Sequence, residues 1–352
     1  MPPEVLESMA VASKAFVDMN LLLKKAGQRI AQLAGAEAAY VTSGAAAGLS
    51  ISAATCMAGT DRARIEQLPN TEGMKNEIVT LKCHRLHFDQ AIRQAGAKLR
   101  EVGYVRRSSP SQLEHAIGDR TAAVFYLPES ATLSGSVPLD EVIQVAKAAG
   151  VPVIVDAAAE LPPVSNLHAF TDMGADLVIF SGGKDIRGPQ GSGFILGRQE
   201  LIEACALNGC PNQSIGRPMK VDKESVVGLV RALEIYVEQD FDREMKTWEE
   251  QVAYLVKHMS KMPYVAVRRG VPLQLGIRPS CIPRAYVDID ESGLGMKVED
   301  VVRSLREGSP GVIVGQSPTG IIINPHMLDP GEETTVLDKI RGILVLASQR
   351  SK

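Results

Sequence analysis

The feature that most constrains this chain is a lysine set between two apolar segments by glycine-rich turns. The segments at 177–180 and 193–197 have the length and composition of buried strands. Ser-Gly-Gly at 181–183 directly precedes Lys184, and Gly-Pro-Gln-Gly at 188–191 follows it. Because glycine permits tight turns, this pattern predicts that Lys184 is held on a short loop between strands. Such a lysine is suited to react as an amine; a hairpin with a solvated lysine is the alternative interpretation.

A third apolar segment, at 151–155, is followed by an acid, Asp156. Ligands of open α/β sheets bind at the carboxyl ends of the strands, and both Asp156 and Lys184 follow such ends. The two residues are 28 positions apart, which leaves room for one crossover helix and one more strand. Pyridoxal phosphate (PLP) chemistry requires an acid beside the pyridinium nitrogen and a lysine that forms a Schiff base. The pattern therefore indicates a PLP site.

The motifs Asp-Ala-Ala-Ala at 156–159 and Ser-Gly-Gly-Lys-x-x-x-Gly-Pro-Gln at 181–190 resemble those of fold-type I PLP-dependent enzymes. More narrowly, they resemble the branch that includes bacterial selenocysteine synthase and D-glucosaminate-6-phosphate ammonia-lyase, from about residue 2 to about residue 328. The resemblance implies an α/β fold of the PLP-transferase type, with a mainly parallel seven-stranded sheet between helices and a smaller C-terminal α+β domain. We expect the large PLP-binding domain at 1–260 and the small domain at 261–352.

Apolar spacing along the chain predicts which parts are helical. The positions between 11 and 34 fit one amphipathic helix that ends at Gly35, and a long helical region between 222 and 259 would join the two domains. The C-terminal part alternates predicted strands with predicted helices. The strands are expected at 265–268, 285–289 and 320–323, and the helices at 298–307 and 333–348.

A turn rich in small residues is the predicted phosphate site. Ser43, Gly44 and Ala45 follow a short strand at 38–42 and open a helix, whose exposed N–H groups and dipole favour an anion. The resemblance places the PLP phosphate at the matching turn, and a capped helix packed closely on its neighbours is the alternative. Residues 38–60 carry no charge, but their small side chains favour a buried helix over a membrane span.

The resemblance also implies that an aromatic ring or an imidazole covers one face of the PLP ring. His84 and His87 follow a predicted strand and are the candidates, with His84 favoured. Either histidine could instead cap the helix that begins near Phe88. Ala158 would lie against the opposite face of the ring, and Ser181, within the lysine motif, is assigned to the same cofactor site.

Basic residues are abundant near these motifs and could hold an anionic substrate. The candidates for substrate binding are Lys75, Arg85, Arg187, Lys220 and Arg284. The resemblance implies that Arg217 and Lys220 contact the phosphate or the substrate. In one arrangement, the two residues reach the site from a neighbouring subunit. A solvated loop is the alternative for the loop residues among them. Arg278 is a second candidate in the C-terminal domain, and Glu129 or Ser130 could face the cofactor at the end of a further strand.

Charge and cysteine content disfavour several classes of protein. The net charge of −3 disfavours a nucleic-acid-binding protein held by bulk electrostatics. The five cysteines form no Cys-x-x-Cys pair, which favours reduced thiols over a disulfide framework or a zinc site, and we expect no metal. The polar start of the chain does not resemble a signal peptide, so a cytoplasmic location is expected. The resemblance implies a homo-oligomer, a dimer or larger, whose active site is shared between subunits.

Together these residues predict PLP-dependent chemistry at the Cα atom of an amino substrate. Lys184 would bind PLP and then act as the general base for the Cα proton, while Asp156 would keep the ring nitrogen protonated. We expect a lyase that eliminates a β-hydroxyl and releases ammonia from a small anionic amino acid or amino sugar acid, as the resemblance implies. Selenium transfer onto a seryl group carried by tRNA is the main alternative. Racemisation, aldol cleavage and a non-catalytic binding protein with the same fold also remain open.

Overall fold

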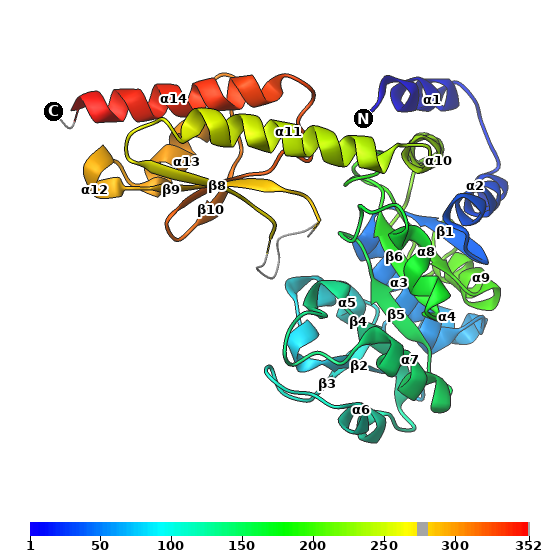
Figure 1. The fold of residues 1–352 in the computed structure, drawn as a ribbon. Helices are drawn as coiled ribbons and strands as arrows, with labels where there is room; N and C mark the ends of the chain where they lie inside the picture. Colours follow the sequence, from blue (N-terminus) through cyan, green and yellow to red (C-terminus); the bar gives the residue numbers. More distant parts are fainter. Residues whose placement is uncertain (273–280, 351–352) are drawn as a thin grey trace. The chain divides into compact units, whose positions relative to one another are not determined.

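The computed structural model describes residues 1–272 and 281–350 of the 352-residue chain. The chain divides into two compact units, Met1–Glu238 and Gln239–Lys352, each with apolar core clusters of its own. The first unit contains a large mixed sheet covered by helices, and the second contains a smaller antiparallel sheet (Figure 1). None of the described helices is both long enough and apolar enough to cross a lipid bilayer.

The sheet of the first unit has seven strands among the described residues: β1 (Ala38–Thr42), β2 (Glu77–Leu81), β3 (Lys98–Val102), β4 (Thr121–Tyr126), β5 (Val153–Asp156), β6 (Leu177–Ser181) and β7 (Gly193–Gly197). Their order across the sheet is β1-β7-β6-β5-β4-β2-β3. β2 to β6 pair in parallel, whereas β7 is antiparallel to both β6 and β1. All of these strands except β7 therefore have their carboxyl ends at one edge, and the predicted mainly parallel sheet is confirmed.

Helices cover both faces of this sheet (Figure 1). They are α1 (Pro3–Ser13), α2 (Met19–Ala34), α3 (Ala45–Ala58), α4 (Arg62–Gln67), α5 (Gln90–Gln94), α6 (Pro110–Ala116), α7 (Leu139–Ala148), α8 (Asn166–Asp172), α9 (Gln199–Asn208) and α10 (Lys223–Val237), with 3₁₀ turns η1 (Lys82–His84), η2 (His87–Asp89) and η3 (Pro128–Ser130). Alternate residues of a strand point to opposite faces, so Val155 of β5 belongs to one apolar cluster and Ile154 to the other. The result is a three-layer α/β/α arrangement.

The N-terminal region contains two helices where the sequence predicts one. A break separates α1 from α2. Asp18 starts α2 because its carboxylate accepts hydrogen bonds from the N–H groups of Asn20 (2.9 Å) and Leu21 (3.2 Å). Gly35 ends α2 in the left-handed conformation, with φ of 66°. The prediction of a single helix over 11–34 is therefore wrong, because the cap at Asp18 begins a new helix within a continuous apolar pattern.

α3 and β1 are largely buried, as the uncharged composition of 38–60 indicates. Small residues let this helix lie close to the sheet. A Cβ atom at Gly48 would lie only 2.8 Å from Cγ2 of Ile179 in β6, closer than carbon atoms normally approach. The close packing fixes the first turn of α3 at the edge of the sheet where β1 and β6 end.

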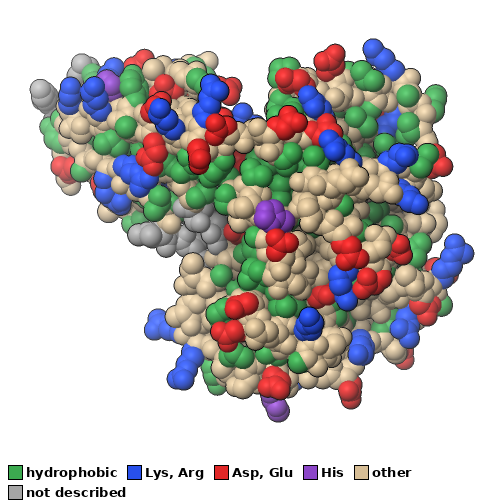
Figure 2. Space-filling view, turned by 45° about the vertical axis from the view of Figure 1, so that its right-hand side comes forward, with side chains coloured by type: hydrophobic (Ala, Val, Ile, Leu, Met, Phe, Trp, Pro, Cys, Tyr) green, Lys and Arg blue, Asp and Glu red, His purple; other side chains and the backbone are tan. Residues whose placement is uncertain are grey.

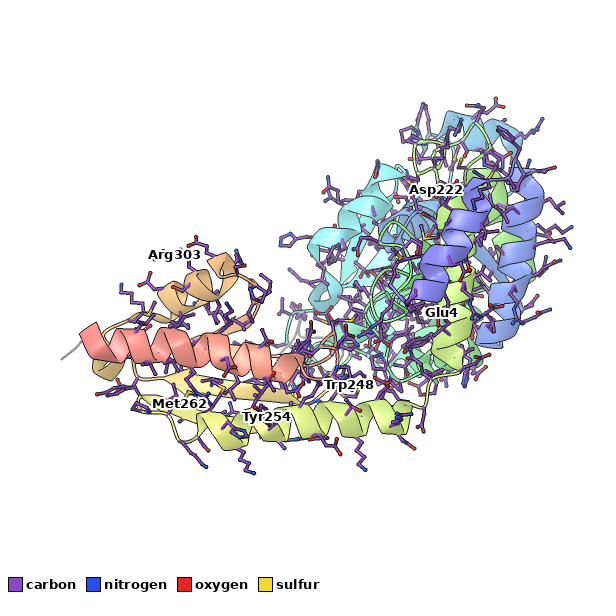
Figure 3. The ribbon with its side chains drawn as sticks, turned by 90° about the horizontal axis from the view of Figure 1, so that it is seen from above. Glu4, Asp222, Trp248, Tyr254, Met262 and Arg303 are labelled. Carbon is purple, nitrogen blue, oxygen red and sulfur yellow. The ribbon has the colours of Figure 1, made fainter. Side chains whose placement is uncertain are left out.

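The second unit is the small α+β domain that the sequence predicts. Its elements are α11 (Phe241–Met259), β8 (Val265–Gly270), β9 (Arg284–Ile289), α12 (Glu291–Leu294), α13 (Val298–Glu307), β10 (Gly315–Ser317), β11 (Gly320–Ile323) and α14 (Glu332–Arg350). Among the described residues the strands form an antiparallel sheet in the order β10-β11-β9-β8. Trp248 and Tyr254 lie along α11 (Figure 3), and Leu255 of this helix belongs to the core of the second unit. The units therefore divide after Glu238, and not after residue 260 as the sequence suggests.

Candidate active site

The carboxyl edge of the sheet brings Asp156 and Lys184 together. Asp156 is the last residue of β5 and pairs in register with Ile179 of β6. β6 ends at Ser181, and Lys184 follows it on the connection to β7. The positive charge of Lys184 lies close enough to the Asp156 carboxyl to lower its pKa. The two groups thus interact electrostatically, and their chemical roles stay predictions.

The Asp156 carboxyl is buried, with 7% of the residue exposed. Burial raises its pKa from an ordinary 3.8 to about 6, because a carboxylate loses its hydration in the protein interior. The Ala158 N–H, which donates to Oδ1 at 3.1 Å, and the charge of Lys184 act in the opposite direction. The charge of Glu129, on η3 after β4, raises the pKa further, so Glu129 also lies near this site.

Lys184 is carried by a tight loop, residues 182–191, which we call the lysine loop. The Gly182 N–H donates to the Ser192 carbonyl, and the Gly188 N–H donates to the Gly182 carbonyl, both at 2.9 Å. These hydrogen bonds draw the ends of the loop together at the start of β7. Lys184 is exposed, so the packing of its side chain does not hold it in place. The backbone of the loop determines the position of its Cα atom.

Two positions in the lysine loop need an unusual backbone. A Cβ atom on Gly183 would lie 2.7 Å from Cα of Gln190, so the turn requires glycine there. Arg187 has φ of 56°, in the left-handed region, and its N–H donates to the Lys184 carbonyl at 2.9 Å. A left-handed conformation costs an L-residue about 1–2 kcal/mol, and such residues cluster at functional sites. The loop is therefore a strained connection held in one shape.

The predicted phosphate turn lies directly against the start of β7. Gly193 pairs with the last residues of both β1 and β6, the second of which is Ser181. A Cβ atom on Gly193 would lie 2.8 Å from the Gly44 carbonyl carbon and 2.9 Å from the Ala45 nitrogen. α3 has no side-chain cap, so its first N–H groups are available to an anion. Ser43, Gly44 and Ala45 thus share one edge of the sheet with the lysine loop.

The surroundings of His84 differ from those expected. The ring is fully buried, at 0% exposed, and packs edge-on against Tyr126 with the ring centroids 4.6 Å apart. The Leu127 N–H donates to Nδ1 at 3.2 Å, and Nε2 lies 2.9 Å from the Ser136 hydroxyl. Burial lowers the pKa of His84 to about 4, so the ring is neutral and Nε2 carries the proton. In this arrangement the imidazole has no exposed face for a cofactor ring, whereas His87 is exposed.

Arg85 and Lys75 are poorly placed to hold a substrate. Nε of Arg85 donates to Oδ2 of Asp89 at 2.5 Å, and Nη1 donates to Glu101, so two carboxylates already balance its charge. Lys75 precedes β2 and therefore lies at the amino edge of the sheet, opposite to Asp156. A strand of this length spans roughly 17 Å, which separates Lys75 from the carboxyl edge. The substrate-binding roles of Arg85 and Lys75 stay predictions.

The remaining basic candidates lie at separate places in the chain. Arg217 and Lys220 are exposed on the segment before α10, and Nη1 of Arg217 donates to Sγ of Cys210 at 3.4 Å. Arg284 belongs to the second unit, where it is 2% exposed and burial lowers its pKa. Arg278 lies outside the described residues. The proposed contacts of these residues with cofactor or substrate stay predictions.

The described residues contain free cysteines and no cluster of metal ligands. Within residues 1–272 and 281–350, all five cysteines are free, and no group of three His, Cys, Asp or Glu side chains could hold a metal ion. Burial raises the pKa of the Cys205 thiol to about 12, so this residue stays protonated. A buried, protonated thiol is neither a nucleophile nor a metal ligand.

Asp185 of the lysine loop and Tyr236 of α10 form a hydrogen bond with each other, and neither was identified from the sequence. The Tyr236 hydroxyl, on α10, donates to Oδ2 of Asp185 at 2.5 Å, and the two residues are 51 positions apart. Asp185 directly follows Lys184, and that adjacency was the available signal. Tyr236 lies in an ordinary amphipathic helix, so nothing in the local sequence marks it.

Comparisons with known proteins agree with these motifs. Residues 21–262 match the family described as SelA, L-seryl-tRNA selenium transferase. The chain is 35% identical over 349 residues to D-glucosaminate-6-phosphate ammonia lyase of Salmonella typhimurium, which covers 97% of this chain and 90% of that protein. It is 32% identical over 351 residues to 5'-C-glycyluridine monooxygenase-decarboxylase of a Streptomyces species, which covers 97% of this chain and 85% of that protein.

A solved structure of D-glucosaminate-6-phosphate ammonia-lyase matches the fold with a TM-score of 0.85 at 34% identity. The match covers 99% of this chain and 92% of the other. The motifs at 156–159 and 181–190 both fall within the residues matched to the family. Family, fold and motif positions thus agree, and the chain belongs to the SelA family, with the fold of the fold-type I PLP-dependent enzymes.

Proposed function

We propose that this chain is a PLP-dependent ammonia lyase that acts on a hydroxylated amino acid or amino sugar acid. The reaction removes the Cα proton, eliminates the β-hydroxyl and releases ammonia to leave a 2-keto product. The observation that carries the proposal is the meeting of an exposed lysine, Lys184, with a buried carboxyl group, Asp156, at the carboxyl edge of the sheet. A relative and a solved structure that cover nearly the whole chain carry the name of an ammonia lyase.

The residues at this edge fit a bound PLP. The buried Asp156 carboxyl can pair with a ring nitrogen, and the uncapped start of α3 can bind a phosphate. The Ser130 hydroxyl, next to Glu129, is buried and has no hydrogen-bond partner among the described residues, as expected of a group that a ligand completes. When bound, PLP supplies an electron sink for the charge that develops at Cα.

The chain's own residues bind the cofactor and move a proton. The Asp156 carboxylate holds the proton of the ring nitrogen in a buried site, where opposite charges attract more strongly than in water. The N–H groups at Gly44 and Ala45, with the Ser43 hydroxyl, bind the phosphate. Nζ of Lys184 takes the Cα proton as the general base. The backbone of the lysine loop sets where Nζ lies relative to Asp156.

A small anionic substrate suits the charge distribution better than a tRNA. The net charge is −3, and basic and acidic side chains are intermixed on the face drawn in Figure 2. Arg187 in the lysine loop, Arg217 and Lys220 are the basic residues that we propose for the substrate or the phosphate. Arg284 of the second unit is the proposed partner of a substrate carboxylate. We further propose a cytoplasmic homo-oligomer whose subunits share the site.

Selenium transfer onto seryl-tRNA is the second candidate, because the matched family carries that description. The relative named as a monooxygenase-decarboxylase is nearly as similar as the ammonia lyase, so identity alone does not choose the reaction. Elimination of ammonia and selenium transfer can both use the same lysine and the same acid. The products therefore decide between them.

The first experiment is the visible absorption spectrum of the purified protein with added PLP. The wild-type protein and a control variant, Lys147→Ala on the exposed end of α7, should show the band of lysine-bound PLP. Lys184→Ala should lack it. Absence of the band from the wild-type protein would overturn the assignment of PLP.

The second experiment measures products. PLP-loaded protein with D-glucosaminate 6-phosphate should release ammonia and a 2-keto acid in equal amounts, with unphosphorylated D-glucosaminate and serine as comparison substrates. A loaded protein that releases no ammonia from any of them contradicts the lyase assignment. A stable complex with seryl-tRNA would then favour the transferase.

A further inference from the structure

The lysine loop rests on one face of α10. A Cβ atom on Gly182 would lie 2.5 Å from Cδ1 of Leu229, and one on Gly188 would lie 3.3 Å from Cβ of Ala232. Residues four apart lie on the same face of a helix, so Ala232 and Tyr236 point the same way. The loop therefore contacts a continuous stripe on α10, and glycine in the loop allows the close approach.

Tyr236 is one turn beyond this contact and is 2% exposed. Its hydroxyl donates to Oδ2 of Asp185 at 2.5 Å, a length typical of a hydrogen bond from a hydroxyl to an ionised carboxylate. Such hydrogen bonds are stronger than those between neutral groups. Asp185 follows Lys184 directly, so this bond fixes the backbone beside the reactive lysine.

We propose that Tyr236 and Asp185 form a positioning pair that holds Lys184 in register with Asp156. The proposal rests on the proposed function of Lys184. The lysine side chain is exposed, and the loop also contains the strained Arg187, so interactions elsewhere must hold the loop in its shape. A misplacement of about 1 Å can lower a reaction rate about 100-fold, so a bond that fixes the loop matters for rate.

The N-terminal helix also packs against α10, next to the contact between α10 and the lysine loop. α1 lies beside α10 in both views, with Glu4 on α1 and Asp222 at the start of α10 labelled in Figure 3. A Cβ atom on Gly228 would lie 2.7 Å from Cγ of Met9 and 2.9 Å from Cγ of Pro189. α1, α10 and the lysine loop therefore meet around Gly228. In our proposal, the hydrogen bond between Tyr236 and Asp185 is the contact of this region that positions Lys184.

The test is amide hydrogen exchange in the PLP-free protein. Tyr236→Phe removes only the hydroxyl and should speed exchange in the lysine loop about tenfold or more, the effect of losing a hydrogen bond to a charged group. Tyr40→Phe is the matched control. Tyr40 is also buried, and its hydroxyl donates to the Cys210 carbonyl at 2.8 Å, away from the loop. Equal loop exchange in the two variants would overturn the proposal.

A double-mutant cycle separates a specific pair from general loosening. Asp185→Ala and Tyr236→Phe should each speed exchange in the lysine loop, and the double variant should speed it by clearly less than the product of the two separate effects. Asp185→Asn keeps an acceptor oxygen, so it should restore part of the protection that Asp185→Ala removes. Additive effects of the two substitutions contradict a pair. If Tyr236→Phe does not fold, the two Asp185 variants test the same bond.

A second readout connects the pair to Lys184. In the PLP-loaded protein, Tyr236→Phe should lower kcat about tenfold and leave KM within about twofold, since the loop positions the base and does not bind the substrate. An unchanged kcat overturns the positioning role even if exchange is faster. Failure of the wild-type protein to bind PLP would instead refute the proposed function, and the exchange results in the PLP-free protein would distinguish the two failures.

Discussion

Two regions at the same edge of the sheet carry ionisable side chains, and they differ in how those side chains are bonded. After β5 and β6, Asp156 accepts a backbone N–H and Lys184 is exposed. After β2, His84 has both ring nitrogens in hydrogen bonds, and Arg85 pairs with two carboxylates. The ionisable groups of the first region are available to bind a ligand. Those of the second region already form hydrogen bonds and ion pairs that hold its own loops in place.

The pKa shifts lead to the same distinction. Burial raises the pKa of Asp156 to about 6 and lowers that of His84 to about 4, so burial favours the neutral form of both. Neutral His84 satisfies its own hydrogen bonds. Neutral Asp156 would leave the nearby charge of Lys184 without a full counter-charge. The comparison therefore favours the region of Asp156 and Lys184 as the proposed functional region, because its buried acid is not fully satisfied by its surroundings.

The largest effect should come from Asp156→Asn. Turnover should fall about 100-fold or more, because a neutral amide lacks the negative charge that would keep the ring nitrogen of PLP protonated. The PLP-free protein should instead gain up to about 3 kcal/mol of unfolding free energy at pH 7, because a buried charge is removed. Ammonia release and urea unfolding measure the two effects, with Asp140→Asn, an exposed acid of α7, as the control. Equal loss of turnover in both variants would show that the effect is not specific to the buried acid, and the first region would no longer differ from the rest of the surface.

The dependence of stability on pH should separate the two buried groups. The folded pKa of Asp156 lies above its unfolded value of 3.8, so its contribution to stability is present below about pH 4 and is lost as the pH rises to about 6. The folded pKa of His84 lies below its unfolded value of 6.5, so its contribution is lost as the pH falls from about 6.5 to 4. At 1.36 kcal/mol per pKa unit, each contribution is about 3 kcal/mol.

These opposite slopes should largely cancel in the PLP-free wild-type protein. Asp156→Asn should leave a curve that rises with pH, and His84→Asn should leave one that falls. Circular dichroism is a better probe of unfolding than tryptophan fluorescence here, because Trp248, the single tryptophan, belongs to the second unit. Parallel curves for the two variants would show that the two groups do not differ as described.

Local patterns account for what the sequence predicts well. Apolar runs that end at glycine or at an acid predict β5, β6 and β7. The glycine-rich motif between β6 and β7 predicts that Lys184 lies on the loop that joins these two strands. The environment of His84 depends on Leu127 and Ser136, which lie 43 and 52 positions away. No spacing rule joins those residues, so a buried histidine and a cofactor-covering histidine look alike in the sequence. The same reason explains why Tyr236 was missed.

The position of Lys75 depends on a different property of the fold, the edge of the sheet at which a loop lies. Lys75 is close in sequence to the segment after β2, but a strand separates the two ends of that region in space. Two residues that are close in sequence can lie at opposite edges of a sheet, so sequence separation alone does not show which edge a residue occupies. Assigning each loop to the amino or carboxyl end of its strand would have placed Lys75 at the amino edge, because Lys75 precedes β2.

A smaller effect, on stability rather than on turnover, should follow His84→Ala. The substitution leaves the Leu127 N–H and the Ser136 hydroxyl without the imidazole and opens a cavity beside Tyr126. The expected loss of unfolding free energy is about 2–4 kcal/mol. Urea unfolding measures it in the PLP-free protein. A fall in turnover with little loss of stability would favour the alternative, that His84 covers the cofactor ring.

The smallest effect should come from Arg85→Ala. Arg85 pairs with Asp89, which is buried, and with the more exposed Glu101, so the loss should be about 1 kcal/mol and should shrink in high salt. Arg85→Lys should recover only part of it, because lysine lacks the planar fork that can contact two carboxylates. Unfolding free energy and KM for an anionic substrate are measured together. If KM rises tenfold while stability stays constant, Arg85 binds substrate after all, and the region after β2 is functional despite its internal ion pairs.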